Sequence, residues 1–169
     1  GAASVDVGTY TGKSLVFDSA SSNYLTDTPG SDGNRKTWTF SCWAKRCGDD
    51  VAHTLLGSQV AYGSQQVKFT SDNKLRFDNY VYSPAEFNYR IRSNAIYRDP
   101  GAWYHVVAVW DTTNVTADDR MRLYVNGERL TSLEERYNPT SSFESGINSG
   151  VAFQIGDYTA TANCELNGY

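Results

Sequence analysis

The sequence predicts an all-β protein, a two-sheet antiparallel jelly-roll sandwich. Residues 103–110 (WYHVVAVW) are apolar on both faces, which is typical of a strand in the middle of packed β-structure. Residues 120–128 (RMRLYVNGE) alternate apolar and polar side chains before Asn126-Gly127, the strongest short hairpin signal. Many short β-rich runs separated by turn residues, without a long 3.6-residue pattern, favour a sandwich over any helical fold.

The elements follow in chain order from alternation and turn residues. Strands are predicted at 14–17, 23–25, 37–46, 53–57, 66–70, 74–79, 90–95, 103–111, 120–126, 128–131 and 151–156. Residues 71–73 (SDN) form a turn, and 112–119 and 138–150 are polar, turn-rich loops. Ser132 and Glu135 have the spacing of a capping box, so 132–135 is predicted as one helical turn.

Length and charge limit the possible classes of protein. The 169 residues suit a single domain spanning 1–169 that can bury a real core. The net charge is −4 and the basic residues are dispersed, which argues against a nucleic-acid or anionic-membrane partner. No apolar run approaches the length of a membrane span.

Three cysteines leave an odd count. Alternation puts Cys42 beside Phe40 and Ala44, as a small buried hydrophobe. One disulfide is possible, with Cys47–Cys164 the pairing to test, but three free thiols are favoured because nothing else reads as a disulfide scaffold. The two histidines have no Cys or His at ligand spacing, which argues against zinc.

Several stretches, spread in order over nearly the whole chain, together resemble a known family. They are 14–18 (SLVFD), 23–25 (NYL), 34–41 (NRKTWTFS), 43–46 (WAKR), 98–105 (RDPGAWYH), 111–113 (DTT), 123–128 (LYVNGE), 155–156 (IG) and 167–169 (NGY). The chain resembles the concanavalin A-like lectin/glucanase superfamily in its laminin-G-like jelly-roll branch. It is most similar to copies found in structural proteins of tailed bacteriophages, especially marine ones.

The resemblance implies roles for the matched residues and shows two departures. Trp38, Trp43, Trp103 and Trp110 are expected to fill or rim the sandwich core, and His105 to be a hydrogen-bonded structural histidine. Cys42 replaces a small residue, usually glycine, in the family pattern. Residues 167–169 correspond to the start of the family's last core strand, so we expect that strand to be truncated, with an open edge able to pair with another chain.

Relatives that hydrolyse glycans need two carboxylates at alternating positions on one strand face. Here the acidic residues come as adjacent pairs in predicted loops or the helical turn: Asp49-Asp50, Asp118-Asp119 and Glu134-Glu135. No nucleophile motif or phosphate-binding glycine loop is present. The sequence therefore indicates a protein that is not an enzyme.

No metal or cofactor is predicted, but a loop-bound calcium ion stays open. Hard oxygen ligands could come from loops, although their spacing matches no defined calcium loop and acidic loops are usually solvated turns. The candidates are Asp72, Asn73, Asp78, Asn79, Asp118, Asp119 and Asp157.

Sugar binding favours aromatic rings with amide and carboxylate neighbours in loops. The candidate carbohydrate-binding residues are Asp78, Asn79, Tyr80 and Tyr82, with Asn88 and Tyr89 close behind and Asp157 and Tyr158 as a second group. The alternative is that these are ordinary β-edge tyrosines.

We expect a non-catalytic lectin-like domain of a phage virion protein that binds host cell-surface glycans and is multimeric in its assembly. It would act on the virion surface, outside the cell. The alternative is a structural or assembly module that contacts other virion proteins, and a glycoside hydrolase is a third, weaker reading.

Overall fold

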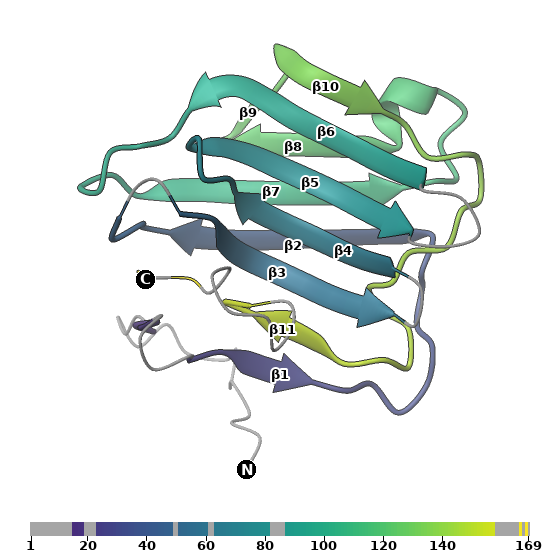
Figure 1. The fold of residues 1–169 in the computed structure, drawn as a ribbon. Coiled ribbons are helices and arrows are strands. Elements are labelled where there is room, and N and C mark those ends of the chain that lie inside the picture. The colour runs from purple at the N-terminus through teal and green to yellow at the C-terminus, as the bar shows by residue number, and fades with distance from the viewer. Residues whose placement is uncertain are drawn as a thin grey trace.

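Two antiparallel sheets pack face to face, the larger one in front in Figure 1. The structure, a computed structural model, describes residues 15–18, 23–48, 51–60, 63–81, 87–157, 166 and 168. The seven-stranded sheet has the order β1–β11–β3–β4–β5–β6–β10 and the four-stranded sheet the order β2–β7–β8–β9. The predicted two-sheet sandwich is confirmed.

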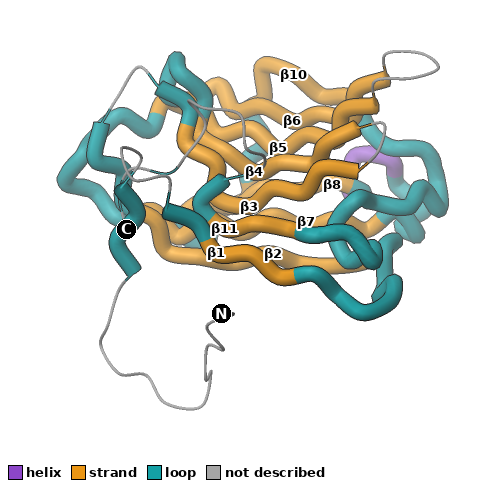
Figure 2. The backbone as a smooth tube through the Cα atoms, turned by 60° about the horizontal axis from the view of Figure 1, so that its bottom comes forward, coloured by secondary structure: helices purple, strands orange, loops and turns teal. Residues whose placement is uncertain are grey.

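The strands are short and most end at turn residues. In the seven-stranded sheet they are β1 (Leu25–Asp27), β3 (His53–Val60), β4 (Gly63–Phe69), β5 (Lys74–Val81), β6 (Phe87–Ile96), β10 (Leu133–Tyr137) and β11 (Phe153–Ile155). In the four-stranded sheet they are β2 (Thr37–Ala44), β7 (Tyr104–Asp111), β8 (Met121–Val125) and β9 (Glu128–Arg129). The connecting loops gather at the two ends of the strands (Figure 2).

The core lies between the sheets and is rich in aromatic rings. Trp110 on β7 and Phe77 on β5 are fully buried, and their ring centroids lie 5.9 Å apart across the sandwich. The β2–β7 register pairs Trp38 with Trp110, and their rings stack at 6.3 Å. Period-2 alternation therefore places every second residue of β2 and β7 in this core.

The helical turn predicted at 132–135 is wrong, because residues 133–135 are the first three residues of strand β10. Glu135 on that strand makes ion pairs with Arg90 and Arg92 of β6, at 3.0 and 3.1 Å. Pairing with β6 and these ion pairs outweigh the local capping pattern, which depends only on residues close in sequence. The strand expected at 14–17 is, among the described residues, an isolated bridge between Phe17 and Gly168.

Cys42 lies on the inner side of β2 and carries a free thiol. Burial raises the pKa of this thiol to about 12, as expected of a cysteine used as a small hydrophobe. Cys164 lies outside the described residues, so the Cys47–Cys164 pairing stays a prediction. Among the helices in the described ranges, none is long and apolar enough to cross a membrane.

Candidate functional site

Trp43 stands on the outer face of the four-stranded sheet. Inner positions of β2 are Trp38, Phe40 and Cys42, so alternation turns Trp43 outward. Its residue surface is 62% exposed, and its indole stacks on the His105 imidazole at 5.0 Å with an interplanar angle of 25°. A large, rigid aromatic ring is therefore presented to solvent by a regular strand.

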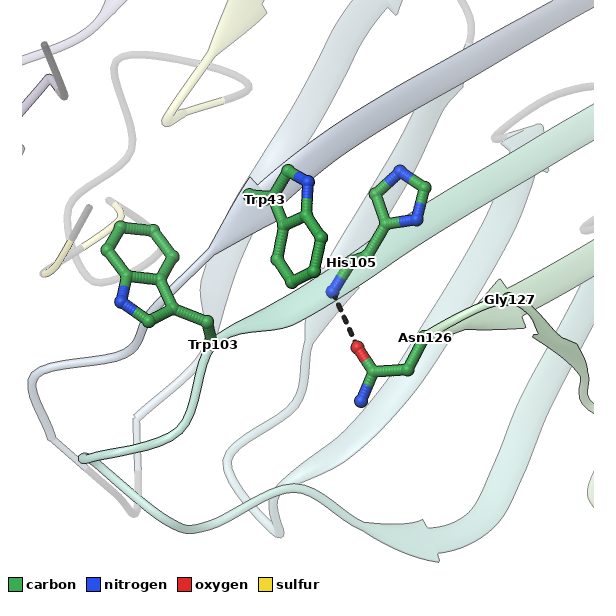
Figure 3. Close-up of a pocket in the computed structure, with 5 residues that line it drawn as sticks. All are labelled: Trp43, Trp103, His105, Asn126 and Gly127. Carbon is green, nitrogen blue, oxygen red and sulfur yellow. Dashed lines mark hydrogen bonds between the residues drawn. The ribbon is translucent and has the colours of Figure 1, made fainter. Parts of the chain in front are cut away.

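Trp43 is one wall of a surface hollow of about 430 Å³ (Figure 3). Trp103, His105, Asn126 and Gly127 complete the lining, and Trp103 is itself 43% exposed. Trp103 comes from the loop before β7, His105 from β7 itself, and the last two residues from the turn between β8 and β9. Three elements far apart in sequence thus meet at one end of the four-stranded sheet.

Backbone and side-chain hydrogen bonds hold the polar wall of the hollow in place. The backbone N–H of His105 donates to Asn126 Oδ1 at 2.9 Å, and the backbone N–H of Asn126 donates back to the His105 carbonyl at 2.9 Å. Asn126 and Gly127 have φ values of +52° and +86°, which confirms the predicted Asn-Gly turn. Ser41 Oγ lies 2.9 Å from His105 Nε2, so His105 is hydrogen-bonded as expected.

The lining offers two indoles, an imidazole and an amide, and no carboxylate. Exposed indole faces desolvate at little cost and favour flat apolar surfaces, while the amide can orient a polar ligand group. Such a hollow suits binding of a ring with one apolar face and polar edges. It lacks the paired acid and base that hydrolysis requires.

The structure places the predicted carbohydrate-binding residues elsewhere. Asp78, Asn79 and Tyr80 lie within β5, not in a loop, and the β5–β6 register sets Asn79 opposite Tyr89 and Tyr80 opposite Asn88. The ladder therefore brings Asn79, Tyr80, Asn88 and Tyr89 together, but Tyr80, Asn88 and Tyr89 lie in strands and not in the loops expected for sugar binding. The reason is that β5 and β6 extend further than alternation indicated, to Val81 and from Phe87.

Several of these residues are also closed off from solvent. Asp78, Asn79, Tyr89 and Asp157 are between 2% and 5% exposed. The Tyr89 ring packs against Phe143 at 4.8 Å and its hydroxyl lies 3.3 Å from Thr140 Oγ1, so it is a core residue. Tyr82 and Tyr158 lie outside the described residues.

Asp78 belongs to a charged network on the outer face of the seven-stranded sheet. Its Oδ2 lies 2.7 Å from Arg76 Nε and 3.7 Å from Arg90 Nε, while its Oδ1 has no hydrogen-bond partner. Burial raises the pKa of Asp78 despite the opposing charges of Arg76, Lys68 and Arg90. Burial also acts to raise the pKa of Glu135, but hydrogen bonds from Arg90 and Arg92 outweigh it and hold that pKa below its ordinary range.

The calcium candidates do not converge in the part of the chain that the structure describes. Asp72 accepts from Thr70 and pairs with Arg92, while Asp119 pairs with Arg129 and Asp118 accepts from Asn138. Within the described ranges no group of three or more His, Cys, Asp or Glu residues could hold a metal ion. The acidic side chains found there serve cation pairing and turns.

Sequence reasoning missed the hollow because it expected all four tryptophans to fill or rim the core and did not separate the two that are exposed. Trp38 and Trp110 do pack there, but Trp43 and Trp103 are exposed. The signal was present in the strand 37–44 itself: if Cys42 faces inward, its neighbour Trp43 must face outward. The convergence of Trp43 with Asn126, in contrast, depends on tertiary packing.

The two-sheet sandwich with an aromatic surface hollow is a jelly roll of the lectin-like class. The family model described as the concanavalin A-like lectin/glucanases superfamily matches residues 18–169. The chain therefore belongs to this superfamily, as the sequence resemblance predicted.

Solved structures share the fold at low sequence identity. A native heptameric SAP-like pentraxin from Limulus polyphemus is 17% identical with a TM-score of 0.53, covering 86% of this chain and 71% of that one. The CBM40 of the Ruminococcus gnavus IT-sialidase, bound to α2,6-sialyllactose, is 13% identical with a TM-score of 0.53, covering 85% and 87%. No curated protein matches the chain in a sequence search. These likenesses establish the fold.

Proposed function

We propose that this domain is a non-catalytic lectin-like module that binds cell-surface glycans through the hollow formed by Trp43, Trp103, His105, Asn126 and Gly127. The observation that carries the proposal is the pair of exposed tryptophans, 62% and 43% accessible, one on β2 and the other just before β7. Large exposed aromatic rings gathered around one hollow are typical of interaction sites. The sialyllactose-bound CBM40 with the same fold supports a glycan as the ligand class.

The charged face of the seven-stranded sheet supports a non-catalytic role. A glycosidase needs two carboxyl groups about 5–9.5 Å apart with free access to the sugar. Asp78 is 2% exposed, and Glu135 is engaged by Arg90 and Arg92. Burial closes Asp78 off from a sugar, and the two arginines engage Glu135, so this pair does not offer a free acid and a free nucleophile.

The proposed binding is weak at each site and strong through repetition. A sugar face that buries roughly 150 Å² of apolar surface on the indoles gains about 4 kcal/mol before the cost of immobilising the ligand is subtracted, so a dissociation constant of about 1 mM or weaker is expected at one site. Repeated copies on a surface raise the effective affinity by about 10²–10⁴. Display in many copies on the virion of a tailed phage, indicated by the sequence resemblance, would supply that repetition and place the domain outside the cell.

A glycan array probed with the domain multimerised on a tetravalent carrier tests the proposal. Binding to at least one class of cell-surface glycan is expected from the unaltered domain and its loss from the double variant Trp43→Ala/Trp103→Ala. The matched control is Val115→Ala, because Val115 is 94% exposed and lies outside the hollow. No binding to any glycan by the multimer, or equal binding by the double variant, would refute it.

Contact with other virion proteins is a second candidate, favoured by the edge position of β2. This strand of eight residues ends the four-stranded sheet of the described residues. An edge strand of that length is a template for pairing with another chain. If the partner is a second copy of this chain, Thr39→Lys on the exposed face should abolish concentration-dependent association in sedimentation velocity, and a monomer at all concentrations would rule that partner out.

A further inference from the structure

Asn126 gives the hollow a polar group of fixed character. Its Oδ1 accepts from the His105 backbone N–H at 2.9 Å. Reversing the amide would point an N–H group at that N–H, so the orientation is determined by its partner. The Nδ2 group, with two hydrogens to donate, is therefore the part of Asn126 that a ligand meets, and Figure 3 shows it directed away from His105.

The other polar atoms of the hollow add donors or adapt to the ligand. Indole N–H groups only donate. The imidazole of His105 is engaged at Nε2 by Ser41, whose hydroxyl can donate or accept, so its second nitrogen can take either role. No Asp or Glu side chain lines the hollow. Among the side chains of the lining, fixed donors outnumber fixed acceptors, and no carboxylate opposes an anionic ligand.

We propose that the hollow selects pyranosides that carry a strong acceptor group, the carbonyl of an acetamido group or a carboxylate, next to the ring face stacked on Trp43. This inference rests on the proposed glycan-binding function. An acceptor group pairs with the Asn126 amide without leaving a hydroxyl hydrogen unpaired, and a charged or strongly polar acceptor strengthens that bond. An acetamido methyl group adds apolar contact with an indole. Together these terms predict a preference of about fivefold to tenfold over a hydroxyl at the same ring position.

Three methyl glycosides of one ring geometry test the preference: methyl β-glucoside, methyl N-acetyl-β-glucosaminide and methyl β-glucuronide, with the galacto series in parallel. Each is titrated into the full chain while the indole N–H resonances are followed by NMR. The glucosaminide and the glucuronide are expected to bind at least fivefold tighter than the glucoside. Added salt should weaken binding of the charged glucuronide and leave binding of the uncharged glucosaminide unchanged, which distinguishes a carboxylate acceptor from an acetamido acceptor.

The variant Asn126→Asp isolates the donor. Aspartate keeps an oxygen for the His105 N–H and tolerates the positive φ of +52°, but replaces Nδ2 by an acceptor oxygen. The affinity of the variant for the acetamido and carboxylate sugars is expected to fall at least tenfold, while its affinity for the glucoside is unchanged. Unchanged indole resonances of the sugar-free variant show that it is folded. Trp43→Ala, in contrast, should lower the affinity for all three sugars by a similar factor.

The outcomes separate this inference from the function on which it rests. If all three sugars bind the unaltered chain equally, or if Asn126→Asp weakens the glucoside as much as the others, the acceptor preference is wrong and the lectin proposal stands. If no sugar shifts any resonance and the multimerised domain also binds no glycan, both fail.

Discussion

Trp38 and Trp43 lie five residues apart on one strand but face opposite sides of the sheet, so truncating each should have very different consequences. Trp38 packs on Trp110 and Phe77, at 6.3 and 5.6 Å, and its indole N–H donates to Ser145 Oγ at 2.8 Å. Removing a packed tryptophan side chain costs about 3–5 kcal/mol, and the lost hydrogen bond about 1 kcal/mol more. Trp38→Ala is therefore expected to remove a large part of the domain's stability.

Trp43→Ala is expected to cost much less. With 62% of the residue exposed and about 250 Å² for a whole tryptophan, roughly 95 Å² is buried. At about 25 cal/mol per Å² this sets an upper bound of about 2.4 kcal/mol, which the compactness of the unfolded chain lowers further. The two variants should thus differ by at least about 1.5 kcal/mol in the free energy of unfolding.

Urea unfolding followed by far-UV circular dichroism measures both values, because tryptophan fluorescence changes with the substitutions themselves. Equal m-values are required before the midpoints are compared. Trp43→Phe, which keeps a smaller ring, is the matched control and should fall between the unaltered chain and Trp43→Ala. If Trp43→Ala costs as much as Trp38→Ala, the Trp43 indole is part of the packing and the surface hollow is misassigned.

Three further predictions concern other positions. Burial raises the pKa of Asp78 in the folded chain, so the folded chain loses stability relative to the unfolded chain as pH rises above the unfolded-state pKa. The variant Asp78→Asn avoids this loss, so its gain in stability over the unaltered chain should grow as pH rises from 3 to 8 and vanish at the acid end. Thermal melts in which the gain falls with rising pH would contradict this. With a pKa of about 12, the Cys42 thiol should resist iodoacetamide at pH 8 in the folded chain and react in urea, as peptide mass spectrometry can show. Gly156→Ala should lower the melting temperature by several degrees, since φ is +89° and the new Cβ would meet Phe17 Cδ1 at 2.6 Å; an unchanged melt would show that this contact relaxes freely.

Most of the fold was predictable because strand alternation and turn residues are local signals. Nearly every expected strand exists, and the hairpin turn at Asn126-Gly127 is where the sequence placed it. The failure at 132–135 has a different origin. Ser132 and Glu135 satisfy a local capping pattern, but in the folded chain Glu135 instead forms ion pairs with Arg90 and Arg92, on a strand some forty residues earlier. No window of neighbouring residues contains that information.

The site was harder to predict because density of Asp, Asn and Tyr along the chain is a poor guide to exposure. The segment containing Asp78 and Asn79 has the composition of a sugar-binding loop, yet it is the buried end of a strand. Trp43 has a large apolar side chain, yet that side chain is on the surface.

Alternation, applied to the tryptophans as strictly as to the fold, reverses the second of these assignments. On β2 the inward set begins at Trp38, so an indole five positions later must leave the core, at the cost of exposing a large apolar ring. A fold that needed only a filled sandwich would place a small or polar residue there. This ring, with Trp103 and the fixed amide of Asn126 beside it, is the observation on which the proposed glycan-binding site rests.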